Sequence, residues 1–215
     1  MLPSFRCIRP RPRIFLLPSH RRFAYTRAMY RRQAFLTMRI LWGSLLASIA
    51  IYAAILAFNL IPHQDAPNAP EMLYAFAPLA LVLSVMSFVL PMRLHQQAAM
   101  RAKLKINEEA IADESFSAAY REAPPSKIQK IFDDTHAAER AAVAAFMSPF
   151  VLSLALSEAV ALFGFVLGFL GFDAKAFIPF FVLGAILMLL RFPTEKAVFS
   201  SFERIRGAVF SGRNN

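Results

Sequence analysis

The chain has 215 residues, a formal net charge of +10 and a mean hydropathy of +0.46. Hydrophobic residues make up 57% of it and charged residues 18%, whereas soluble domains carry about 25% charged residues. These values exclude an ordinary soluble domain and indicate an integral membrane protein. The basic residues gather at the ends of apolar runs, which argues against nucleic acid as a partner. The single cysteine, Cys7, excludes an intramolecular disulfide and a cysteine-based metal site.

The N-terminal tail, residues 1–38, contains nine arginines, four prolines and no acidic residue. Such a composition does not build a core, so we expect a basic, disordered tail. One interpretation is a targeting peptide or a polybasic arm that binds anionic lipid. The preferred interpretation is that translation starts at Met29 or Met38, because the prolines prevent an amphipathic helix. The mass of the purified protein distinguishes these interpretations.

Four apolar runs follow, and we interpret each as a helix that crosses the bilayer, which takes about 20 residues. The first run ends at Pro62, and the second stops before Arg93. A tight turn joins the third run to the fourth. The four runs cover residues 40–61, 72–91, 149–172 and 176–190.

The predicted fold is an all-α membrane protein with four transmembrane helices, arranged as two hairpins with a helical cytoplasmic segment between them. That segment is expected to form two helices, over residues 94–121 and 127–147, because both stretches are rich in helix-forming residues and Pro124-Pro125 separates them. The expected divisions are a tail (1–38), a first hairpin (39–92), the cytoplasmic segment (93–147), a second hairpin (148–192) and a C-terminal tail (193–215).

Lysine and arginine are distributed unevenly among the connections. Ten lie before the first run, none in the first loop, eight in the middle segment, one in the second turn and five after the fourth run. By the positive-inside rule, both termini and the middle segment lie in the cytoplasm. The expected location is the bacterial inner membrane.

The two predicted hairpins resemble each other in sequence. Residues 49–58 align without gaps with residues 160–169, and Ala75-Phe-Ala-Pro78 matches Ala176-Phe-Ile-Pro179. Duplication of one hairpin and chance similarity between apolar helices both explain this alignment. In it, Ala47 takes the place of Glu158, so only the second hairpin has a carboxylate at that depth.

A carboxylate, Glu158, lies within the third apolar run, in the stretch Val151–Phe172. A charge at mid-depth of a membrane costs roughly 2.5–3.5 kcal/mol on insertion scales. The presence of Glu158 there indicates a structural or functional role. No lysine, arginine or histidine lies at the same depth in any run, so Glu158 is expected to be protonated and hydrogen-bonded. Hydroxyl groups at a similar depth are its expected partners, namely Ser48, Tyr52, Ser84, Ser87 and the adjacent Ser157.

Small residues form a continuous stripe along the third run and a comparable stripe along the first. Such stripes allow helix backbones to approach closely in lipid. They predict that the first and third helices form the central pair, with Glu158 at the edge of their contact. The third-run stripe consists of Ser153, Ser157, Ala161, Gly164, Gly168 and Gly171, and the first-run stripe of Gly43, Ala47, Ala50, Ala54 and Ala57.

The middle segment offers few groups for catalysis or metal binding. His136 and Glu139 share one helical face and His95 lies in the same segment, but a metal site needs a further ligand that the sequence does not identify. A solvated surface is the preferred interpretation. The chain contains no glycine-rich phosphate loop, nucleophile elbow or zincin motif. We therefore expect no enzymatic activity, no cofactor and no metal, and identify no small-molecule substrate.

The stretch Ala155-Leu-Ser-Glu-Ala159, followed by Leu162-Phe163 and small residues, resembles the carboxylate-bearing helix of the ATP synthase proteolipid, subunit c. In that family the matching glutamate carries a proton or a sodium ion through a membrane ring. The resemblance covers the third run and implies that role for Glu158.

Two hypotheses for the function remain open. In the first, this is a non-enzymatic multi-pass membrane protein in which Glu158 is a buried, protonatable packing group, with a second copy or another membrane protein as a partner. In the second, Glu158 carries a proton or another cation across the membrane. Proton flux measured with the Glu158→Gln variant separates the two.

Overall fold

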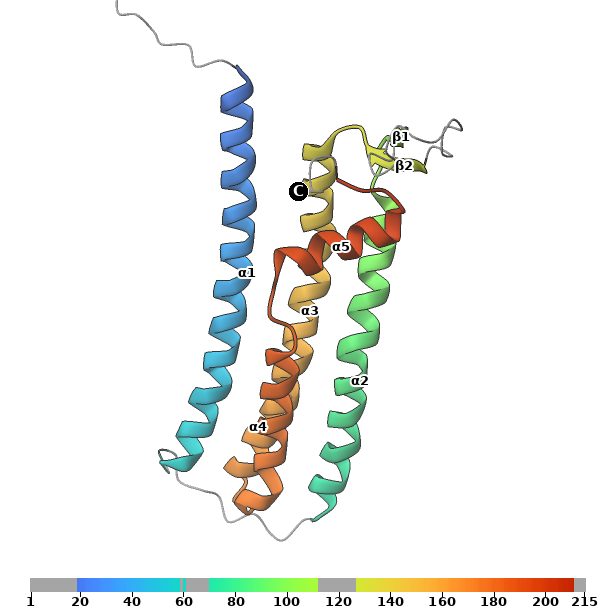
Figure 1. Ribbon diagram of the computed structural model, residues 1–215. Helices are drawn as coiled ribbons and strands as arrows, with labels where there is room; N and C mark the ends of the chain where they lie inside the picture. Colours follow the sequence, from blue (N-terminus) through green and yellow to red (C-terminus); the bar gives the residue numbers. More distant parts are fainter. Residues whose placement is uncertain (1–18, 59, 61–69, 112–126, 211–215) are drawn as a thin grey trace, which may run out of the picture.

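The computed structural model of the chain is a helical bundle with a small β-hairpin at one end (Figure 1). It describes residues 19–58, 60, 70–111 and 127–210, so residues 1–18 of the predicted tail and Pro124-Pro125 lie outside the described residues. The elements in chain order are α1 (Ser19–Ala57), α2 (Pro70–Arg101), β1 (Ile106–Ile111), β2 (Lys127–Phe132), α3 (Thr135–Phe169), α4 (Ala174–Leu189) and α5 (Glu195–Arg206).

Three helices are long and apolar enough to cross a membrane, in the ranges Met29–Ala57, Glu71–Arg101 and Thr135–Phe169. They agree with the expectation of an integral membrane protein. The apolar helix α4 has only 16 residues. At 1.5 Å per residue it is about 24 Å long, shorter than the roughly 30 Å hydrocarbon core of a bilayer. The coarse prediction of a helical membrane protein is thus confirmed, whereas the predicted fourth span is shorter than a membrane-crossing helix usually is.

Helix α3 is the centre of the bundle (Figure 1). The antiparallel helix α4 packs along it, α1 packs on α3 and α4, and α2 packs on α3 from the other side. The start of α1, the β-hairpin and α5 lie at one end of the bundle, and the turn between α3 and α4 lies at the opposite end (Figure 1). The two predicted hairpins therefore differ in packing, because α3 and α4 contact each other directly while α1 and α2 flank that pair.

The expectation of disorder in residues 19–38 is wrong, because α1 begins at Ser19 and continues without interruption into the first apolar run. The prolines that argue against a helix all precede this point, and the last of them is Pro18. The arginine, alanine, leucine and methionine residues that follow are good helix formers. Phe35 and Met38 belong to the buried core, which fixes this part of α1 against the rest of the protein.

The prediction of two helices between residues 93 and 147 is only partly correct. Helix α2 extends to Arg101 and α3 begins at Thr135, but β1 and β2 form an antiparallel pair between them. Phe132, at the end of β2, is buried against Phe202 and Phe210. These partners lie far along the chain, so their contacts override the local preference for helix. Val209 also bonds to the backbone of β2, through Lys130 and Phe132.

The region predicted only as a C-terminal tail contains the amphipathic helix α5. The side chain of Thr194 accepts a hydrogen bond from the Ala197 N–H and caps its start, while Gly207 ends it with a φ of 64°. This left-handed conformation suits glycine because it has no Cβ atom. The apolar face of α5 buries Val198, Phe199 and Phe202 against the bundle, so α5 closes the end that carries the hairpin (Figure 1).

The stripe of small residues on α3 is buried as predicted, from Ser153 to Gly168, but its main partner is α4 rather than α1. A Cβ atom on Gly164 would lie 2.9 Å from the backbone oxygen of Phe177, and one on Gly184 would lie 2.9 Å from the Ala161 Cβ. The predicted central pair is therefore corrected to α3 and α4. Gly171 lies beyond the end of α3, in the turn, with a φ of 83°.

Most of the small residues in the predicted stripe of α1 do not pack in the bundle, and Gly43 and Ala54 are partly buried. Ala47, Ala50 and Ala57 are exposed, and no atom lies within 4 Å of a Cβ built on Gly43. Large side chains of α1 make its contact with α3 instead, and Leu56 packs on Gly168. Lipid is as apolar as these alanines, so burying them brings no hydrophobic gain, and a large side chain fills the groove beside a glycine better.

Candidate polar site in the helix bundle

Glu158 lies in the middle of α3 and is partly buried at the contact with α1. The Ser48 hydroxyl of α1 donates a hydrogen bond of 2.6 Å to Oε1 of Glu158. The structure thus places one of the predicted hydroxyl partners on the carboxyl group. This bond connects two helices whose other contacts in this region are apolar, so it fixes the register of α1 along α3.

The Ser48 hydroxyl has a second acceptor within reach, the backbone oxygen of Leu45 at 2.7 Å. A serine hydroxyl has one proton, so it donates to only one of the two oxygens at a time. When Glu158 is ionised, the hydroxyl proton goes to the carboxylate. When Glu158 is protonated, its O–H donates to Ser48 and the hydroxyl proton goes to Leu45. The site therefore accommodates both protonation states by rotation of a single hydroxyl.

The other predicted partners of Glu158 make different contacts. The Tyr52 ring packs on Phe165, with 5.2 Å between ring centroids. The hydroxyls of Ser84 and Ser87 donate to backbone oxygens of α2 one turn earlier, and Ser157 donates in the same way to Ser153. Each of these hydroxyls gives its proton to a backbone oxygen of its own helix. The hydroxyl oxygens of Ser87 and Ser157 therefore remain available as acceptors.

Arg191, which follows the fourth predicted run, binds these acceptor oxygens. The guanidinium of Arg191 donates to the Ser87 hydroxyl oxygen of α2 at 2.7 Å and to the Ser153 backbone oxygen of α3 at 3.1 Å. It also donates to the Ser157 hydroxyl oxygen, and it lies over the Phe88 ring at 4.4 Å from the centroid. Arg191 thereby joins α2, α3 and the end of α4.

Arg191 brings a positive charge to the residue next to Glu158 in the chain, Ser157. This differs from the expectation that no cation lies near the depth of the carboxylate. The signal in the sequence is Pro193, which prevents α4 from continuing, together with the shortness of the run before it. A short fourth helix places its C-terminal flank inside the bundle, so the long arginine side chain reaches the serines of the neighbouring helices.

The backbone at the end of α4 is satisfied by α1. The last carbonyl groups of a helix have no partner within the helix. The Trp42 indole N–H of α1 donates to the Met188 oxygen at 2.9 Å, and the Trp42 ring packs edge-on against Phe192. The end of α4 is thus stabilised from two sides, by Trp42 of α1 and by Arg191 through α2 and α3.

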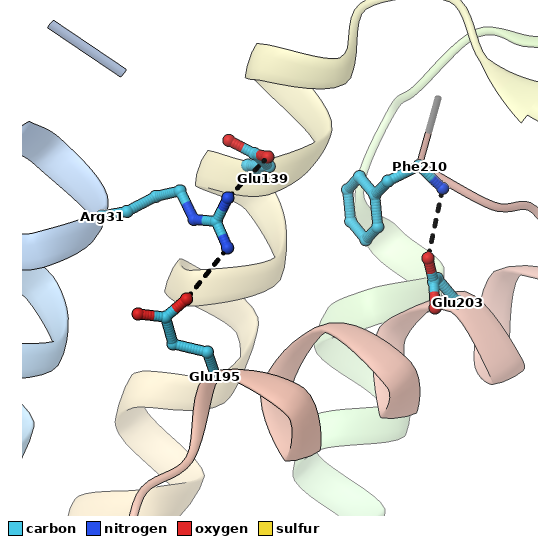
Figure 2. Close-up of polar contacts among 5 residues, drawn as sticks. All are labelled: Arg31, Glu139, Glu195, Glu203 and Phe210. Atoms are coloured by element: carbon cyan, nitrogen blue, oxygen red, sulfur yellow. Dashed lines mark hydrogen bonds and ion pairs between the residues drawn. The ribbon is translucent and has the colours of Figure 1, made fainter. Parts of the chain in front are cut away.

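A second polar cluster lies at the end of the bundle that carries α5. Figure 2 shows Arg31 of α1 reaching between Glu139 of α3 and Glu195 of α5. The ion pairs measure 3.6 Å to Glu139 and 3.0 Å to Glu195, and the guanidinium lies 4.7 Å from the centroid of the Phe199 ring. Nearby, the Phe210 N–H donates to the Glu203 carboxylate, which holds the chain after α5 against that helix (Figure 2).

A buried histidine joins three helices at the same end. Pro149 has no N–H, so the Ala145 oxygen in α3 lacks its usual partner from the next helical turn. Nδ1 of His95 in α2 lies 3.2 Å from this oxygen and acts as the donor, because a carbonyl only accepts. Nε2 lies 3.1 Å from the Ser201 hydroxyl of α5. His95 is therefore a structural link between helices.

Within the ranges that the structure describes, no three His, Cys, Asp or Glu residues are grouped closely enough to hold a metal ion. His95 and Glu139, two of the possible ligands in the sequence, contact Ala145 and Arg31 respectively.

Comparison with known proteins finds no match for this chain among family models, curated proteins or solved structures. We therefore infer the function of this chain from the geometry of its polar groups and from their place in the bundle.

Proposed function

We propose that this chain is a non-enzymatic multi-pass membrane protein in which Glu158 is a protonatable group at the contact between α1 and α3. The observation that carries the proposal is the 2.6 Å bond from Ser48 to Glu158, within a bundle of three membrane-length helices. Ionisable residues inside a membrane are costly and are usually kept for a role. Here the carboxyl group has a hydroxyl partner that suits both of its protonation states.

The proposed topology has four crossings, with both termini and the β-hairpin in the cytoplasm of a bacterium and the protein in its inner membrane. Helix α4 is short, but it runs antiparallel to α3 from the turn at residues 170–173. Hydrogen bonds of Trp42 and Arg191 hold its C-terminal end to the neighbouring helices. Arginine side chains near helix ends reach several ångströms to a polar partner. The charged residues of the connections support this orientation through the positive-inside rule.

A second candidate function is transport of a proton or another cation by Glu158, the role implied by the resemblance of α3 to the ATP synthase proteolipid. Two observations favour it. Glu158 is only partly buried, and Arg191 is bonded to the adjacent Ser157. Partial exposure leaves the carboxyl group open to an exchanging cation, and Arg191 brings a charged group to the neighbouring position of α3. Partnership with a second copy or with another membrane protein is compatible with both candidates.

Proton flux across liposomes separates the candidates. The purified full chain is reconstituted, and the wild type is compared with Glu158→Gln, which removes the ionisable group at nearly constant size. Flux that the substitution abolishes identifies a carrier and overturns the packing role. Equal, background-level flux for both, together with no carbodiimide labelling at Glu158, overturns the carrier role. Ser84→Ala, whose hydroxyl bonds only within α2 among the described residues, is the matched control.

A further inference from the structure

We propose that Arg31 is a positioning residue for the Glu158 site. By clamping the start of α1 to α3 and α5, it holds Ser48 against the carboxyl group of Glu158. This inference rests on the proposed role of Glu158 as a protonatable group, and it adds a second site, at the far end of α1, that controls the first.

The clamp joins three elements through one side chain (Figure 2). Arg31 forms ion pairs with Glu139 and Glu195, and its planar guanidinium lies over Phe199. The Glu139 side chain is 7% exposed, so its charge is shielded from water and the ion pair is less screened than one on the surface. A planar group with several donors also matches two carboxylates better than a lysine does.

Helix α1 transmits the position of this clamp to Ser48. The two residues are 17 positions apart in one continuous helix, a distance of about 25 Å. Besides the clamp, the hydrogen bonds from α1 side chains to other elements, among the described residues, are those of Trp42 to Met188 and of Ser48 to Glu158. The guanidinium of Arg39 also lies 5.7 Å from the centroid of the Phe192 ring. The rest of its inner face is apolar. Phe35 and Met38 pack in the core beside the clamp, and such contacts are less directional than ion pairs. Loss of the clamp therefore lets α1 tilt or slide, and the bond to Glu158 weakens.

The first test is infrared spectroscopy of the purified full chain at acidic pH, where the carboxyl group carries its proton. The Glu158 carboxyl band is the one that disappears in Glu158→Gln. Ser48→Ala is expected to shift this band to higher frequency, because the carboxyl group loses a hydrogen bond. Arg31→Gln is expected to shift it in the same direction, and Arg31→Lys to retain part of the wild-type position. Arg32→Gln, at the exposed neighbouring position, is the control and leaves the band unchanged.

The second test measures the position of α1 without reference to Glu158. Spin labels are placed on the exposed Leu36 of α1 and Met100 of α2, after Cys7→Ser, and the distance between them is measured. Arg31→Gln is expected to broaden the distance distribution, and Arg32→Gln is not. Unchanged distances and an unchanged carboxyl band in Arg31→Gln overturn the clamp. A broadened distribution without any Glu158 band in the wild type keeps the clamp but overturns the proposed protonatable role of Glu158.

Discussion

Each serine hydroxyl inside the bundle has one proton to donate, and the oxygen that receives this proton decides the serine's other polar contacts. Ser87 and Ser157 donate to backbone oxygens of their own helices, so their oxygens face Arg191 as acceptors. Ser48 has two acceptors for one proton, and this makes its bond to Glu158 responsive to the charge of the carboxyl group. Serine thus provides both the fixed acceptors for the guanidinium of Arg191 and the adjustable partner of the Glu158 carboxyl group.

Replacement of Arg191 is expected to destabilise the bundle. Arg191→Gln removes the bonds that hold the end of α4 to Ser87 and Ser153, with an expected loss of about 2–3 kcal/mol, since hydrogen bonds to charged groups contribute about 1.5–3 kcal/mol. Arg191→Lys keeps the charge but reaches fewer acceptors, so its loss is smaller. Thermal unfolding in detergent measures both. Arg93→Gln, at an exposed position, is the control, and an equal loss there would contradict the role of Arg191.

A pH effect is expected at the start of α3. The Asp134 side chain accepts the Ala137 N–H at 2.9 Å, and this bond lowers the pKa of Asp134 from its ordinary value. The unfolded chain then binds a proton first as the pH falls. The contribution of the cap is complete above the unfolded pKa, near 4, and is lost as the pH drops through the lower folded value.

Unfolding of Asp134→Ala at pH 7 and at pH 3 tests this cap. At pH 7 the variant is expected to be less stable than the wild type by about 1 kcal/mol, the usual effect of an N-cap. At pH 3 the difference is expected to shrink, because the unfolded wild-type chain then binds a proton at Asp134 that the folded chain, with its lowered pKa, binds less readily. Asp134→Asn, which keeps an acceptor without a charge, is the control and should show little pH dependence at this position. A difference that grows toward acidic pH would contradict the assignment.

Helices pack closely where a neighbouring helix fills the space beside a small residue. On α3, Gly164 admits the backbone of α4, whereas on α1 Gly43 faces no other residue. Gly164→Ala is expected to destabilise the protein by about 1–3 kcal/mol, because the added methyl group meets Phe177 and Phe180 at 2.9 Å. Gly43→Ala is expected to be neutral or to stabilise α1 by up to about 1 kcal/mol. Thermal unfolding of the pair checks this, and the reverse order would contradict the α3–α4 pairing.

Figure 1 shows α5, the β-hairpin and the start of α1 at one end of the molecule. Most of the charged residues in the sequence lie in or beside these elements. At the opposite end, the turn between α3 and α4 contains Asp173, and the basic residue Lys175 lies at the start of α4. This asymmetry predicts the orientation of the protein in the membrane.

Reporter fusions test this orientation. A periplasm-specific reporter is expected to be active when it is fused after Asp65 or Lys175, and inactive when it is fused after Asn107. Activity at Asn107 would reverse the proposed topology. Activity at Asp65 without activity at Lys175 would show that α3 and α4 do not cross together.

The sequence alone determined the membrane class, three of the helices and the anomaly at Glu158, because hydropathy and charge along a contiguous stretch decide these features. It also included Ser48 in a short set of hydroxyl partners. The tertiary structure decided the rest. The strands form because Phe132 meets Phe202, the central pair is α3 and α4, and Arg191 reaches Ser157. Each depends on contacts between residues distant in the chain, which local composition does not encode. The position of a residue along a helix follows from the sequence, but the residues that its side chain contacts are decided by the packing of the helices.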